Sequence, residues 1–107
     1  EKNHSLLEKK IIAFAGLGFN KKFFDQLGNY GFNIIKKIDY PDHHKYSVED
    51  IYNLLDIAND LDAHLITTEK DHIRIPNDFK KSIKFIKGHI TVDNEEDLIK
   101  EFKKNID

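Results

Sequence analysis

Short apolar runs that alternate with amphipathic stretches constrain the fold of this chain most. Runs of this length, rich in Ile and Phe and ended by Gly or polar residues, are typical of buried strands. Strands that alternate with helices favour βαβ units and a mostly parallel sheet. We therefore predict a small Rossmann-like α/β domain of three layers with four or five strands. The predicted strands are residues 9–15, 32–40, 63–68 and 83–87, with 90–92 as an extension or fifth strand.

Capping signals predict where the helices begin and end. Asn20 is predicted to cap the first helix, and Gly28 and Gly31 are stop signals. Ser47 and Asp50 resemble a capping box at the start of the second helix, with Asp in place of the usual Glu. Phe23, Phe24 and Leu27 lie on one face of the first predicted helix, and Phe23, Phe24 and Phe32 are predicted to be core residues. In the second predicted helix, the apolar residues that follow at helical spacing are Ile51, Leu54, Leu55, Ala58 and Leu61.

Length, charge and composition exclude several classes of protein. A chain of 107 residues has the size of one domain. We place this domain at residues 9–107 and interpret residues 1–8 as a tail or linker end. Asn94 is predicted to cap a last helix. The absence of Met suggests a piece of a longer protein. The absence of Cys excludes disulfides and thiolate sites, and a net charge of −2 argues against a dedicated nucleic-acid binder. The longest apolar run, 11–19, is too short to span a membrane.

Three polar clusters follow the first three predicted strands, at residues 16–20, 42–46 and 67–71. In parallel sheets, ligands gather at the carboxyl ends of the strands. The sequence therefore predicts a functional site at this edge.

The first cluster contains Gly16 and Gly18. Two glycines between a strand and a helix let backbone N–H groups approach a phosphate, but the same residues also suit a tight structural turn. The third glycine of a dinucleotide fingerprint is missing, and no P-loop pattern occurs in the chain. Arg74 is the only arginine in the chain, so the only forked phosphate-binding side chain stands alone.

The second cluster contains Asp42, His43 and His44. Three adjacent ionisable groups in a loop can bind a metal, relay a proton or orient a nucleophile. Metal sites need three or four convergent ligands, and the other histidines show no ligand spacing, so we expect no metal. The alternative is a solvated loop in which Asp42 caps a turn. His64, inside a predicted strand, is interpreted as a core or edge histidine.

The third cluster combines two hydroxyls with three charges: Thr67, Thr68, Glu69, Lys70 and Asp71. These side chains can contact a nucleotide or a sugar. They can equally form a salt-bridged turn that positions the neighbouring loops, and the sequence slightly favours this structural role.

Taken together, these segments resemble one family. Residues 13–18 with Phe23 and Phe24, then 42–46, then 67–71, resemble the C-terminal domain of tetraacyldisaccharide 4'-kinase, a lipid A pathway enzyme. The resemblance implies that His43 is the catalytic histidine, paired with an aspartate of the other lobe. Asp42, His44 and Tyr46 would then orient the substrate or support His43. One departure is Phe19-Asn20, where the family tends to have Asn-Pro.

The resemblance also implies what the rest of the enzyme supplies. ATP and Mg²⁺ would be bound mainly by an N-terminal P-loop lobe, so no cofactor is expected in this segment. The partners would be that lobe and a lipid disaccharide, with no nucleic acid, at the cytoplasmic face of the inner membrane. Without its P-loop lobe, the segment alone is expected to be inactive.

Two other functions remain open at this point. Asp-His-His also occurs in a Mn²⁺-dependent phosphoesterase superfamily, which needs further aspartate motifs that Asp39, Asp42 and Asp71 replace poorly. The chain can also be a non-catalytic α/β binding or regulatory domain.

Overall fold

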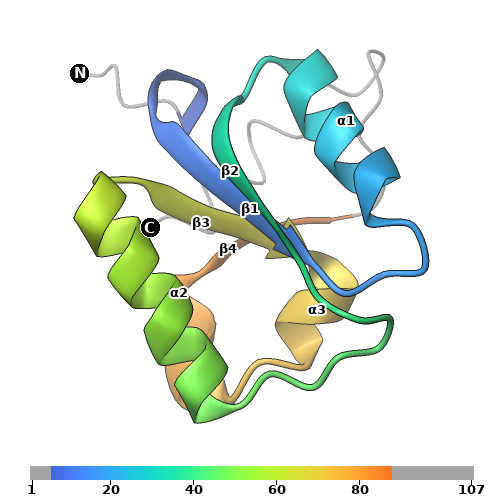
Figure 1. Cartoon of the computed structure of the whole chain (residues 1–107), viewed down its shortest axis with the longest axis vertical. Coiled ribbons are helices and arrows are strands. Elements are labelled where there is room, and N and C mark those ends of the chain that lie inside the picture. The colour runs from blue at the N-terminus through green and yellow to red at the C-terminus, as the bar shows by residue number, and fades with distance from the viewer. Residues whose placement is uncertain (1–5, 88–107) are drawn as a thin grey trace.

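The structure is a computed structural model that describes residues 6–87 (Figure 1). It alternates strands and helices as the sequence predicts. The elements are a 3₁₀ turn η1 (Leu6–Glu8), β1 (Lys10–Ala15), α1 (Asn20–Tyr30), β2 (Asn33–Asp39), α2 (Val48–Leu61), β3 (His64–Thr68), α3 (Glu69–Ile73), a second 3₁₀ helix η2 (Asn77–Ser82) and β4 (Lys84–Ile86).

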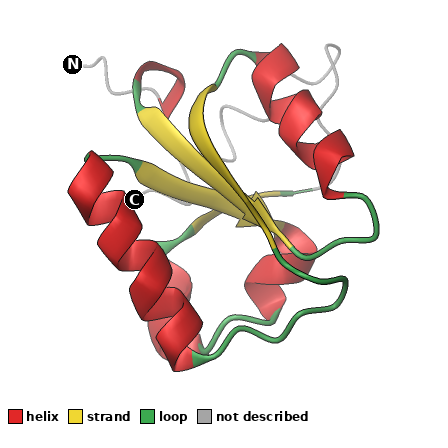
Figure 2. Ribbon diagram, viewed as in Figure 1, coloured by secondary structure: helices red, strands yellow, loops and turns green. Residues whose placement is uncertain are grey.

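The four strands form one parallel sheet in the order β2-β1-β3-β4 (Figure 2). α1 packs on one face of the sheet and α2 on the other. This arrangement confirms the prediction of a three-layer, Rossmann-like α/β domain. The predicted extension at 90–92 and the last helix from Asn94 lie outside the described residues.

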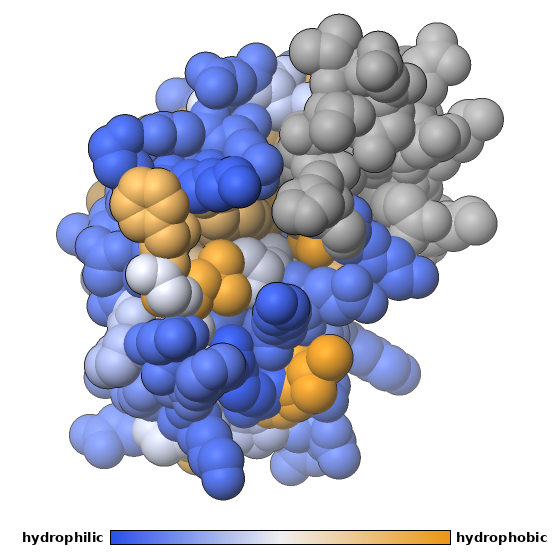
Figure 3. All heavy atoms as spheres, turned by 90° about the vertical axis from the view of Figure 1, so that its right-hand side faces the viewer, coloured by the Kyte–Doolittle hydropathy of each residue, from blue (hydrophilic) through white to orange (hydrophobic). Residues whose placement is uncertain are grey.

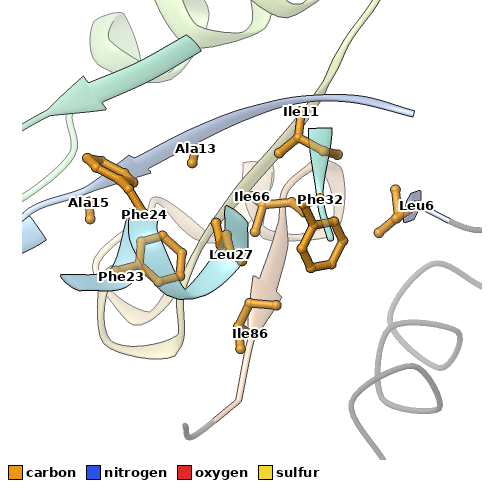
Figure 4. Close-up of a cluster of buried hydrophobic side chains, with 10 residues drawn as sticks. All are labelled: Leu6, Ile11, Ala13, Ala15, Phe23, Phe24, Leu27, Phe32, Ile66 and Ile86. Carbon is orange, nitrogen blue, oxygen red and sulfur yellow. The ribbon is translucent and has the colours of Figure 1, made fainter. Parts of the chain in front are cut away.

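The central strand β1 divides the core into two clusters. Its odd-numbered residues, Ile11, Ala13 and Ala15, pack with Phe23, Phe24 and Leu27 of α1 on one face (Figure 4). Ile12 and Phe14 point to the other face and pack with Ile51, Leu54 and Ala58 of α2. Because side chains alternate along a strand, burial on both faces requires an unbroken apolar run, which is the pattern found at 11–15.

The two ends of α1 differ from the prediction in part. Asn20 is the first helical residue and does not cap the helix; Phe19 occupies the cap position without a side-chain hydrogen bond. The Asn20 carboxamide is used elsewhere, because its Oδ1 accepts from the Leu17 N–H at 2.6 Å. Gly28 lies inside the helix and does not stop it. Gly31 does, with a left-handed φ of 118° that glycine adopts without strain.

Other boundaries confirm or correct the sequence interpretation. Ser47 and Asp50 form the predicted capping box at the start of α2. The structure describes residues 6–8 of the tail predicted over residues 1–8. For these residues the prediction is wrong, because Leu6 is buried in the core cluster that faces α1. A leucine four residues before β1, in a polar stretch, carries no periodicity signal, so only its packing reveals it.

The strand order reverses between β1 and β3. From β1 the chain moves to β2 on one side and then returns past β1 to β3 on the other. In open α/β sheets, ligands bind outside the carboxyl ends of the strands at such a point. Gly16 follows β1 and α3 follows β3, so the candidate site lies between this glycine and this helix.

Candidate functional site

Asp71 is the centre of a hydrogen-bonded cluster at this reversal point. Its side chain is completely buried and lies on α3. Oδ1 accepts from the Gly16 N–H at 2.9 Å, the Tyr46 hydroxyl at 3.0 Å and Arg74 Nη2 at 3.1 Å, and Oδ2 accepts from the Thr68 hydroxyl at 2.6 Å. One carboxylate therefore links the segments that follow β1, β2 and β3. We call these five residues the Asp71 cluster.

Tyr46 and Thr67 support the Asp71 cluster from inside the protein. Tyr46 is 4% exposed, and its ring packs edge-on against Phe14 at 5.4 Å between centroids. Burial, and next the charge of Asp71, hold the pKa of Tyr46 well above its usual value, so its hydroxyl remains a donor. Thr67 is buried and donates to the Phe14 carbonyl at 2.7 Å. Both side chains therefore hold the strand ends in place.

The Gly16–Gly18 turn uses its first N–H groups within the protein. The Gly16 N–H is donated to Asp71 and the Leu17 N–H to Asn20. The Gly16 carbonyl in turn accepts from the His43 N–H at 3.0 Å. This geometry favours a tight structural turn over a phosphate cradle.

We expect Gly16→Ala to destabilise the domain by about 1–3 kcal/mol, because the added methyl group has no room. Its Cβ would lie 2.6 Å from the Pro41 carbonyl oxygen and 3.2 Å from the His44 Cβ. Gly18→Ala is the matched control, since its Cβ would meet Asp42 Oδ2 at an ordinary 3.6 Å. Urea unfolding of both variants measures the difference. Equal midpoints for the two variants would contradict the steric argument.

His43 is presented to solvent by a strained turn. Its φ of 63° lies in the left-handed region, which costs a histidine on the order of 1 kcal/mol or more. Its side chain is 84% exposed, and Nε2 lies 3.8 Å from Asp42 Oδ2, whose side chain is half-exposed. Strained residues of this kind cluster at functional sites.

His44 has the opposite environment to its neighbour. Its side chain is only 26% exposed, Nε2 lies 2.8 Å from Asp50 Oδ2, and its ring stacks on Tyr40. The hydrogen bond from the Ser47 N–H, and next that from His44, hold the pKa of Asp50 below its ordinary value. His44 therefore anchors the loop to α2, while His43 faces outward.

Arg74 is the member of the site that sequence reasoning missed. Nη2 lies 3.1 Å from Asp71 Oδ1 and 3.4 Å from the Gly16 carbonyl oxygen, and Nη1 lies 3.3 Å from His43 Nδ1. Arg74 has no place in the candidate site predicted from the sequence. Its spacing of three residues from Asp71 was a usable signal for an ion pair on one helical turn. Nothing in the spacing indicates the contact with His43, 31 residues away.

The remaining candidates lie on the surface of α3. Glu69 and Lys70 are exposed, and the hydrogen bonds of the Asp71 cluster include neither side chain. His64 lies at the start of β3, at the opposite end of that strand from the candidate site, and is exposed. Desolvation of the part of its ring that is covered, and next the positive charge of Lys9, hold the pKa of His64 below its usual value.

The side of the molecule that carries α1 and the adjoining loops is mainly hydrophilic with scattered apolar side chains (Figure 3).

Two further properties concern residues 6–87 as a whole. Within that range, no group of three or more His, Cys, Asp or Glu side chains is arranged to hold a metal ion. No helix in the same range has the length and apolar character needed to cross a bilayer.

Comparison with known proteins identifies related sequences along nearly the whole chain. Residues 1–107 match the family described as Tetraacyldisaccharide-1-P 4'-kinase. A tetraacyldisaccharide 4'-kinase of Rickettsia akari is 41% identical over 98 residues, and one of Pelagibacter ubique is 34% identical over 91 residues. No solved structure matches the chain.

The extent of these matches defines what they establish. The alignments cover 90% and 85% of this chain but only 30% and 29% of the two relatives. The chain thus spans about a third of the length of the curated relatives that it matches. Since the family match covers every residue, the chain belongs to the tetraacyldisaccharide-1-P 4'-kinase family.

Proposed function

We propose that this chain is the C-terminal lobe of a kinase that transfers the γ-phosphate of ATP to the 4'-hydroxyl of tetraacyldisaccharide 1-phosphate. The observation that carries the proposal is the exposed His43, held in a left-handed turn at the carboxyl ends of the strands. The names of the relatives point to the reaction, and the match over about 30% of their length agrees with a single lobe.

His43 has the chemistry that this reaction needs. A sugar hydroxyl is a poor nucleophile at neutral pH, and phosphoryl transfer depends on its positioning and on removal of its proton. An aspartate–histidine pair formed between the two lobes can do both, because the imidazole orients the carboxylate and the pair accepts the proton of the hydroxyl. Asp42 lies beside the imidazole, whereas His44 and Tyr46 hold the loop that carries it.

The other lobe would supply the remaining parts of the reaction. This chain contains no P-loop pattern, so ATP and Mg²⁺ would be held mainly by an N-terminal lobe, which is also the partner that closes over His43. The lipid disaccharide would bind between the lobes. The whole enzyme would work at the cytoplasmic face of the inner membrane, where such a substrate is presented.

A turnover assay with the full-length protein and with this chain alone tests the proposal. The full-length protein should transfer phosphate from ATP to the disaccharide. The 107-residue chain should unfold cooperatively by circular dichroism and show no transfer, because nothing in it cradles the triphosphate. Transfer by the chain alone, or none by the full-length protein, would contradict the proposal.

Metal titration separates this proposal from a Mn²⁺-dependent phosphoesterase. We expect calorimetry to show no one-to-one site of micromolar affinity for Mn²⁺ or Zn²⁺ in this chain. The reason is that the sequence lacks Cys and that residues 6–87 hold no cluster of three metal ligands. A tight stoichiometric site would favour the phosphoesterase interpretation.

A further inference from the structure

Arg74 contacts both the completely buried carboxylate of Asp71 and the exposed imidazole of His43. We propose that Arg74 is a positioning residue that fixes the ring of His43 with its proton on Nε2. The one link between them is the approach of Arg74 Nη1 to His43 Nδ1 at 3.3 Å.

The guanidinium itself is held firmly. Its Nη2 contacts Asp71 Oδ1 at 3.1 Å and the Gly16 carbonyl at 3.4 Å. Asp71 is completely buried and fixed by three further donors, and the Arg74 side chain is only 19% exposed. Because the guanidinium is a rigid plane, fixing Nη2 also fixes the direction in which Nη1 donates.

The chemistry of the two groups then sets the tautomer. Arginine has only donors, so His43 Nδ1 must be the acceptor of this hydrogen bond. A neutral imidazole that accepts at Nδ1 carries its proton on Nε2. Nε2 lies 3.8 Å from Asp42 Oδ2, beyond hydrogen-bond distance, so its N–H remains available for an acceptor outside this chain.

The backbone of His43 is tied to the same peptide as the guanidinium. The His43 N–H donates to the Gly16 carbonyl at 3.0 Å, and Arg74 Nη2 contacts that same oxygen. The turn and the ring orientation of His43 are thus fixed from a single point. In the proposed reaction, on which this step rests, the Nε2–H would donate to the opposing carboxylate, and that carboxylate would accept the proton of the sugar hydroxyl, because Arg74 occupies the lone pair of Nδ1.

Nitrogen NMR of the ¹⁵N-labelled 107-residue chain in mildly alkaline buffer tests the tautomer without any enzymatic assay. We expect His43 Nδ1 to resonate as an unprotonated nitrogen and Nε2 as a protonated one, with a coupling between Nδ1 and the Arg74 side-chain nitrogen across the hydrogen bond. A protonated Nδ1 in the wild-type chain would overturn the proposal.

The variant Arg74→Lys tests whether the arginine causes this state. Lysine keeps the charge beside Asp71 but lacks the second arm that reaches the imidazole. The His43 nitrogen shifts should move toward the tautomer mixture of a free imidazole. Those of His72, whose Nε2 lies 2.8 Å from the Lys80 carbonyl oxygen, should stay unchanged and report an intact fold. Unchanged His43 shifts would overturn the proposal, and if the variant does not fold, the wild-type coupling decides.

A double-mutant cycle in the full-length protein tests the consequence for catalysis. Arg74→Lys should lower kcat roughly 10-fold to 100-fold with little change in the KM for ATP, because a misaligned group loses orientation rather than nucleotide binding. In a His43→Ala background the same change should cost nothing further. An equal loss in both backgrounds would overturn the proposal. A normal kcat in His43→Ala would instead count against the proposed function, leaving the NMR result to judge the positioning.

Discussion

Replacing His43 by alanine in the full-length protein should lower kcat by about 10²–10⁴-fold, the usual effect of disabling a pair of groups that provides general acid–base assistance. The KM for ATP should change little, because the nucleotide is proposed to bind the other lobe. The physical reason is that His43 is exposed, strained in φ and held by Arg74, so its imidazole is available to the reacting hydroxyl. Steady-state kinetics with varied ATP and varied disaccharide measure both parameters.

Two variants in the same loop serve as controls for that result. Lys45→Ala removes an exposed charge two residues away and should leave kcat nearly unchanged. His44→Ala should act mainly through stability, since His44 pairs with Asp50 and stacks on Tyr40. Melting temperatures of all variants show whether the loop is intact. If His43→Ala keeps kcat within about threefold of wild type, less than ~1 kcal/mol of barrier, His43 has no such role.

Periodicity and capping residues predict most of this fold. The run at 11–15 is apolar at every position because both faces of β1 are covered, and the start of α2 follows from Ser47 and Asp50. The helix-cap prediction fails where one side chain can form two alternative sets of hydrogen bonds. Asn20 suits a helix cap by residue type, but the nearby Leu17 N–H and the end of β2 take its carboxamide instead. Such competition is decided by tertiary contacts that no local pattern contains.

The candidate site was predictable in location but not in internal organisation. Parallel strands bring the clusters at 16–20, 42–46 and 67–71 to one edge, so their proximity follows from the fold class. Which carboxylate is central does not follow, because Asp42 and Asp71 look alike in sequence. The structure buries Asp71 completely and leaves Asp42 half-exposed. Burial separates the residue that holds the loops together from the residues that can meet a ligand.

Asp71→Ala should reduce the free energy of unfolding of this chain by about 3–5 kcal/mol, as expected when one partner of a buried ion pair is removed. Arg74 would lose its counter-charge, and the buried Tyr46 hydroxyl and the Gly16 N–H would lose their acceptor. A small domain has roughly 5–15 kcal/mol to lose, so the variant should be close to unfolding at room temperature. Urea titration followed by circular dichroism measures the effect.

The neighbouring residue on α3 provides the matched control for that experiment. Lys70 is exposed, and Lys70→Ala keeps the helix in place with a residue of high helix propensity, so its effect should stay within about 0.5 kcal/mol. Asp71→Asn should fall between the two variants, because an amide keeps one acceptor oxygen but loses the charge opposite Arg74. If Asp71→Ala costs less than ~1 kcal/mol, the loops are held mainly by apolar packing of residues such as Tyr46 and Phe14, and the carboxylate is dispensable for the fold.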